Sequence, residues 1–141
     1  MEEEFEFLEH TADLKFRSYG RTLGEAFANA GKAIFTTTAD LEDVGTVISQ
    51  KISLEDEDIE ILLHDFLSEL IYLFSVEELL LKKFDVEITQ ADVYKLDATV
   101  YGEKINLEKH SLHKEVKAVT YHDMKIEKQN DAWIIEVICD T

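Results

Sequence analysis

Proline is absent from the 141 residues of this chain, and glycine occurs only five times. Segments that separate domains are usually rich in these residues, so the sequence contains no recognisable linker and no low-complexity stretch. Its length fits one domain, because two halves would each be too small to bury much apolar surface. We therefore expect a single domain over residues 1–141.

Cysteine occurs once, at Cys139, so the chain cannot form an internal disulfide. Residues 1–4 (MEEE) have neither the basic nor the apolar part of a secretion signal. Charges such as Asp65 interrupt the apolar runs, and none of these runs approaches the roughly 20 residues that cross a bilayer. The sequence therefore predicts a soluble cytoplasmic protein without a membrane span, in which Cys139 is an inert residue of the last strand.

Basic residues are scarce. Fourteen Lys and Arg stand against 31 Asp and Glu, which gives a formal net charge of −17. Such a charge repels a phosphate backbone and attracts cations or basic protein surfaces, so we expect no direct nucleic-acid binding. Solubility, or adaptation to a salty or hot environment, would favour the same composition.

The common catalytic motifs are also missing. The sequence has no P-loop, no dinucleotide-binding glycine-rich turn, no CxxC pair and no nucleophile elbow. The acidic run at 55–58 lacks the spacing of an EF-hand loop, and it is better explained as the N-terminus of a helix. Chemistry would have to come from scattered histidines and carboxylates.

Hydrophobic patterning predicts an α+β fold. A capping box at Thr22 and Glu25 begins one helix, at 22–37, and apolar steps of three and four residues predict a second, longer helix from Asp58 to about Phe74. Alternating patterns predict strands at 5–7, 14–18, 44–54, 84–88, 94–100, 116–120, 124–126 and 133–137. We expect a single-domain sandwich of mixed or antiparallel β-sheet with two covering α-helices.

Two groups of oxygen ligands stand out. His10 and Asp13 lie three residues apart between the first two strands, where both could point into one cavity, although Asp13 could equally cap the turn. Asp140 and Thr141 end the sequence, so a carboxylate side chain and a terminal carboxylate stand together. The alternative for the second group is a frayed, solvated tail.

The remaining histidines have plain explanations. His122 and Asp123 could form an acid–base pair, but the YHDM segment is more typical of an exposed turn. His110 and His113 lie in a polar connection, and a zinc site there would need a further nitrogen or sulfur ligand that the sequence does not supply.

Several of these segments resemble the archease family. The resemblance is carried by EHTAD at 9–13, GRTLGEA at 20–26 and EVKAVTYH at 115–122, and it extends through LLHDFLSEL at 62–70 to Asp140. It covers essentially the whole chain, in family order and at family length. Leu14-Lys15 stands where the family usually has isoleucine-glycine, and Thr141 replaces a common leucine or isoleucine.

The resemblance implies an accessory protein of the tRNA-splicing ligase of the RtcB type, which promotes GTP-dependent guanylylation and multiple turnover of that enzyme. It also implies a divalent cation, usually calcium, bound by Asp13, Asp140 and Thr141. We expect His10, His122 and Asp123 to surround this site or to contact the partner. Carboxylate and main-chain oxygens suit a hard cation such as calcium, magnesium or manganese.

Two other readings stay open. The chain could be a chaperone-like interaction module whose acidic surface covers a basic client, with Asp13 and Asp140 purely structural. It could also be a small metal-dependent hydrolase that uses His10 or His122 as a base, although no motif supports this.

Overall fold

The order of secondary-structure elements matches the predicted α+β class. The computed structural model describes residues 3–9 and 13–141. Within these residues the elements are β1 (Phe5–Leu8), β2 (Leu14–Gly20), α1 (Leu23–Thr38), a short 3-10 turn (Leu41–Asp43), β3 (Ile48–Asp56), α2 (Ile59–Ser75), β4 (Leu79–Gln90), β5 (Tyr94–Lys104), β6 (Ala118–Val119), β7 (Lys125–Gln129) and β8 (Ala132–Asp140).

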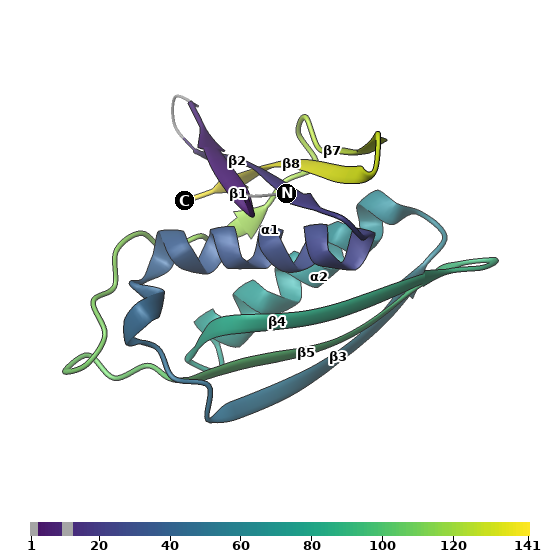
Figure 1. The fold of residues 1–141 in the computed structure, drawn as a ribbon. Helices are drawn as coiled ribbons and strands as arrows, with labels where there is room; N and C mark the ends of the chain where they lie inside the picture. The colour runs from purple at the N-terminus through teal and green to yellow at the C-terminus, as the bar shows by residue number, and fades with distance from the viewer. Residues whose placement is uncertain (1–2, 10–12) are drawn as a thin grey trace.

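The strands form two antiparallel sheets with the helices between them (Figure 1). One sheet has the order β1-β2-β8-β6, with β7 also paired to β8, and the other has the order β3-β5-β4. The α+β sandwich with antiparallel sheets is thus confirmed. The two covering helices form a middle layer between the sheets, so they are buried from two sides.

Small residues allow α1 to lie close to both sheets. Thr22 caps its N-terminus by accepting a hydrogen bond from the Glu25 backbone at 3.0 Å, as predicted. Gly24 has no room for a side chain, because a Cβ atom there would lie 2.2 Å from the carbonyl oxygen of Val86 on β4. Ala26 and Ala30 are fully buried. The position of α1 therefore depends on residues without bulk.

The longer helix, α2, buries one broad apolar face. Asp58 is its N-cap and accepts a hydrogen bond from the Glu60 backbone at 2.8 Å, which confirms that the acidic run ends in a helix start. The side chains that it buries are Leu62, Leu63, Phe66, Leu67, Leu70, Ile71 and Leu73. Its opposite side faces solvent and carries Ile61 and Tyr72.

Several predicted strands have different lengths in the structure. The strand expected at 44–54 begins only at Ile48, because the 3-10 turn and a non-strand segment precede it. The strand expected at 116–120 is reduced to Ala118–Val119, and most of 105–117 is irregular. In contrast, β4 and β5 extend well beyond the predicted segments and form a long hairpin.

The register of β2 and β8 brings distant parts of the sequence together. Phe16 pairs with Val137 and Leu14 pairs with Cys139, and all of these except Leu14 are fully buried in the core.

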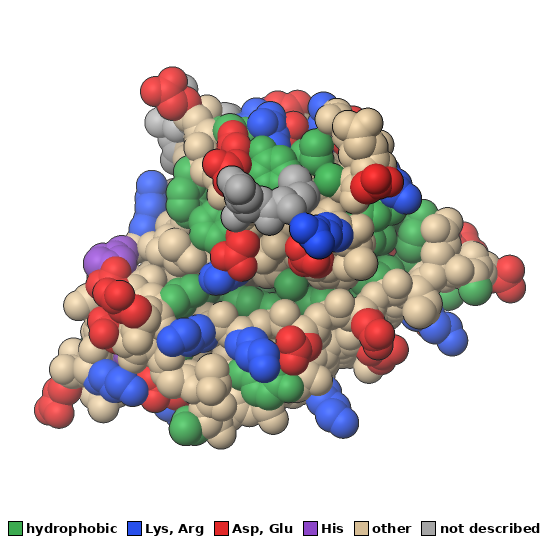
Figure 2. Space-filling view, in the orientation of Figure 1, with side chains coloured by type: hydrophobic (Ala, Val, Ile, Leu, Met, Phe, Trp, Pro, Cys, Tyr) green, Lys and Arg blue, Asp and Glu red, His purple; other side chains and the backbone are tan. Residues whose placement is uncertain are grey.

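On the molecular face that includes α1, acidic and basic side chains are interspersed (Figure 2). Over the described ranges, no helix is long and apolar enough to cross a membrane.

Candidate functional site

Asp13 and Asp140 lie at the same end of neighbouring strands. Leu14, the first residue of β2, pairs with Cys139, so Asp13 precedes β2 where Asp140 ends β8. Asp140 is held in place on its other side by β6, because it pairs with Ala118 and its carbonyl oxygen accepts a hydrogen bond from the Lys117 backbone at 2.8 Å. The frayed-tail alternative is therefore wrong for Asp140.

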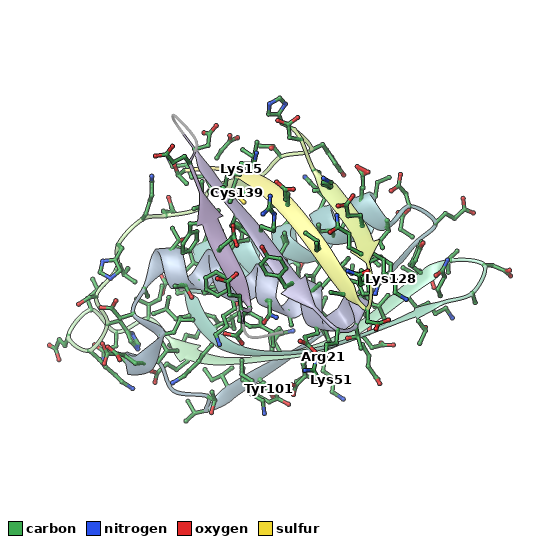
Figure 3. All side chains as sticks on the ribbon, turned by 45° about the horizontal axis from the view of Figure 1, so that its top comes forward. Lys15, Arg21, Lys51, Tyr101, Lys128 and Cys139 are labelled. Carbon is green, nitrogen blue, oxygen red and sulfur yellow. The ribbon has the colours of Figure 1, made fainter. Side chains whose placement is uncertain are left out.

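The pKa of the Cys139 thiol is raised by its burial and by both carboxylates. This side chain is fully buried, and burial, followed by the charges of Asp140 and Asp13, raises its pKa to about 12. A thiol with such a high pKa does not form the nucleophilic thiolate near neutral pH, which agrees with the inert role that the sequence predicted. Figure 3 places Cys139 beside Lys15 at this end of β2 and β8.

The side chains at this end include two carboxylates, those of Asp13 and Asp140. Across residues 3–9 and 13–141, the structure contains no group of three or more His, Cys, Asp or Glu side chains that could hold a metal ion. A cation bound by Asp13 and Asp140 would thus need further oxygen from the main chain, for which the half-buried Thr141 is next in sequence. Such an oxygen-only donor set fits a hard cation and not zinc.

The predicted neighbours of this pair have separate positions. His10 lies outside the described residues. His122 and Asp123 occupy an exposed turn between β6 and β7, where Asp123 has a φ of 51° and the His122 Nε2 atom lies 3.4 Å from the Asp123 carboxylate. The turn prediction for this segment is confirmed.

His110 is a buried structural residue. Its Nδ1 atom accepts a hydrogen bond from the Asn106 backbone at 2.9 Å, so the proton of the neutral ring is on Nε2, which donates to Glu103 at 2.8 Å. His113 lies elsewhere, with its Nε2 atom 3.0 Å from the Asp40 carboxylate. These two histidines therefore do not combine into a zinc site.

Glu103 connects β5 with two loops, and the sequence analysis did not identify it. Its carboxylate also accepts hydrogen bonds from Lys109 at 2.8 Å and from the Gly45 backbone at 2.7 Å. The Lys109, Gly45 and His110 donors lower the pKa of Glu103 to about 2. No sequence signal links Glu103 with Gly45, because they lie 58 positions apart.

We expect Glu103→Gln to lower stability at neutral pH but much less in acid. The folded-state pKa of about 2 lies below the ordinary value of 4.5, so this carboxylate stabilises the fold above pH 4.5 and loses its effect as the pH falls toward 2. Urea unfolding midpoints at pH 7 and pH 3 measure the effect. Glu87→Gln, which changes an exposed carboxylate of β4, is the control, and an equal effect of both variants at each pH would contradict the prediction.

A second aromatic–acidic group also escaped the sequence analysis. The Tyr121 ring stacks on the His64 ring of α2, with 4.3 Å between the centroids and 10° between the planes. Partial burial raises the pKa of Tyr121, and the charges of Asp65 and Asp58 raise it further. The predicted helix places His64 beside its apolar face, which could have suggested a tertiary contact. It could not have identified Tyr121, 57 positions later, as the partner.

Comparison with known proteins relates this fold to one family. The model of the archease protein family (MTH1598/TM1083) matches residues 5–141. The protein archease of Methanosarcina acetivorans is 42% identical over 138 residues, covering 96% of this chain and 94% of the relative. That of Pyrococcus furiosus is 43% identical over 139 residues, covering 97% and 98%.

Solved structures agree with these sequence matches. The solution structure of Methanobacterium thermoautotrophicum protein 1598 has a TM-score of 0.87 at 37% identity and covers 98% of this chain and 99% of its own. A Thermotoga maritima crystal structure, called an archease and possible chaperone, shares the fold with a TM-score of 0.64 at 20% identity, covering 95% and 94%. The chain belongs to the archease family.

Proposed function

We propose that this chain activates a tRNA-splicing ligase of the RtcB type by promoting its GTP-dependent guanylylation and multiple turnover. In this proposal Asp13, Asp140 and a main-chain oxygen of Thr141 hold a divalent cation, preferentially calcium. Membership of the archease family supports an accessory role in place of an enzymatic one. The observation that supports the cation site is the β2–β8 register, which pairs Leu14 with Cys139 and so brings their neighbours Asp13 and Asp140 to the same end of the sheet.

Electrostatics gives this pair a reason to bind a cation. Two carboxylates at one end of a sheet can both donate oxygen to a divalent ion, whose charge would offset theirs. Both charges are felt by the Cys139 thiol, so both act on the same end of the sheet. When bound, such an ion can neutralise phosphate oxygens and polarise a phosphoryl group.

The overall charge supports a protein partner. A net charge of −17 disfavours direct contact with tRNA and favours the basic surface that surrounds a nucleotide- and RNA-binding centre. We expect association with the ligase to slow as salt is raised.

The test is transfer of labelled GMP from GTP to the cognate ligase, with and without this protein. Wild type is expected to stimulate the transfer, and Asp13→Asn and Asp140→Asn are each expected to lose roughly tenfold or more of the stimulation, because each removes a cation ligand. Asp85→Asn and Asp97→Asn are matched controls, since they remove the same charge from exposed positions of β4 and β5.

The other outcomes distinguish the alternatives. Full stimulation by Asp13→Asn and Asp140→Asn would contradict the cation role. It would favour a chaperone-like module that acts through its surface. Hydrolysis of a simple phosphoester by the purified protein alone would favour the hydrolase reading. Absence of stimulation by wild type would reject the ligase as the partner.

A further inference from the structure

The solvent-facing side of α2 carries an unusual share of exposed apolar surface. Ile61, Tyr72 and Val76 are 37%, 45% and 59% exposed, and Tyr121, which packs on this helix through His64, is 51% exposed. Along α2 and its C-cap, positions 61, 65, 68, 72 and 76 follow steps of three and four residues, so they form one line. We call Ile61, Asp65, Tyr72, Val76 and Tyr121 the α2 stripe.

Tyr121 packs against α2 beside the other residues of this stripe. One face of its ring is stacked on His64, and about half of its surface stays open to solvent. The Nδ1 atom of His64 is buried and makes no hydrogen bond, while the Asp65 carboxylate lies 3.5 Å away. A stacked aromatic ring beside a carboxylate forms a ready contact for a cationic side chain.

The α2 helix and the residues that flank it carry acidic side chains and no lysine or arginine. Residues 56–81 contain no Lys or Arg, and their acidic residues are Asp56, Glu57, Asp58, Glu60, Asp65, Glu69, Glu77 and Glu78. One lysine reaches the C-terminal end of the stripe from β5, where the Lys104 amine donates to the Glu77 carbonyl oxygen at 2.7 Å. The face over α1 differs, because basic and acidic side chains mix there (Figure 2).

We propose that the α2 stripe is a docking face for a positively charged, amphipathic segment of a partner protein. Ile61, Tyr72 and Val76 would take its apolar side chains, and the Tyr121 ring with the neighbouring carboxylates would take its Lys or Arg side chains. From Ile61 to Val76 the helix is about 22 Å long, which suits a partner helix of about four turns. The proposal goes beyond ligase activation, because neither the cation nor the ligase enters it.

Charge excludes the other candidates for this face. A second copy of the chain would bring the same carboxylates against the stripe, and like charges across an interface oppose association. Nucleic acids and anionic lipid surfaces are repelled for the same reason. A cationic protein segment is the partner that matches both the apolar and the acidic side chains.

The probe is a fluorescent 16-residue helical peptide of leucine and lysine, with binding followed by fluorescence anisotropy at physiological salt. Tyr72→Ser and Tyr121→Ser are each expected to weaken binding about tenfold, as loss of an aromatic contact at an interface centre does. Val47→Ser and Leu107→Ser are matched controls, because these side chains are 83% and 76% exposed outside the stripe. The controls should keep the wild-type affinity.

Charge is tested with a second pair. Asp65→Asn should weaken peptide binding, whereas Asp85→Asn, which changes the net charge equally at an exposed position of β4, should not. Equal effects of the two variants, or of Tyr72→Ser and Val47→Ser, would mean binding by overall charge or general stickiness and would overturn the proposal. A wild-type dimer in sedimentation that Tyr72→Ser abolishes would overturn it too, since the stripe would then be a self-interface.

Discussion

Gly102→Ala is expected to prevent folding or to lower the free energy of unfolding by more than about 3 kcal/mol. A Cβ atom at Gly102 would lie 1.8 Å from the carbonyl oxygen of Leu80 and 2.8 Å from its carbonyl carbon. These are backbone atoms of β4, so no rotation of a side chain can make room. Gly102 lies in the central strand of its sheet and pairs with both Ile48 and Leu81, which means that any shift disturbs all three strands.

Urea unfolding followed by circular dichroism measures this effect. Gly45→Ala is the control, because its Cβ atom would meet side-chain atoms of Glu103 at 3.2 Å, and no backbone atom, and its backbone N–H would be retained. We expect the control to unfold within about 1 kcal/mol of wild type. Comparable losses in the two variants would show that the close approach at Leu80 is not what requires glycine.

The second large effect is expected on cation binding. Calcium should raise the thermal unfolding temperature of wild type, because a ligand at a hundred times its Kd adds about 2.7 kcal/mol to the stability of the folded state. For a chain of this length that corresponds to a rise of several degrees. Asp13→Asn and Asp140→Asn should abolish the rise, because each removes a proposed ligand of the ion.

Two controls make the calcium result specific. Asp97→Asn removes an exposed carboxylate of β5 and should keep the full response. Thr141→Ala should keep it as well, since the proposed ligand at Thr141 is a main-chain oxygen that no side-chain change removes. An undiminished calcium response in Asp13→Asn and Asp140→Asn would show that these aspartates do not hold the ion.

The helices were the most predictable part of the fold. Thr22 and Asp58 act as the expected caps, because capping depends only on residues within one helical turn. The strand pattern was less informative. The alternation at 116–120 suggested a full strand, but only Ala118 and Val119 pair with β8, because the length of a strand depends on the partner that it finds.

The layer order could not be predicted from the pattern of either helix. An apolar face specifies that a helix is buried, but it does not specify whether one sheet or two will bury it. The small residues of α1 were visible as a run of alanines, yet their reason, the contact of Gly24 with Val86, exists only after β4 has formed.

The candidate site was predicted mainly through the family resemblance. From the residues alone, Asp13 could be either a turn cap or a cation ligand. Asp140 could be either a cation ligand or part of a frayed, solvated tail. The register of β2 and β8 brings the two to the same end of the sheet, although they lie 127 positions apart in the sequence. Glu103 and the Tyr121–His64 stack were missed for the same reason, because they are tertiary contacts without a local signal.

The shortness of β6 has a further consequence. Its two residues pair with Cys139 and Asp140, and only one residue, Thr120, separates it from Tyr121 on the α2 stripe. A partner that moves the Tyr121 ring would therefore also displace β6, the strand that pairs with Asp140. If docking and cation binding both occur, they are thermodynamically linked: each would change the affinity of the other by the same factor. The calcium affinity at the end of β8 would then depend on whether a partner is bound to α2.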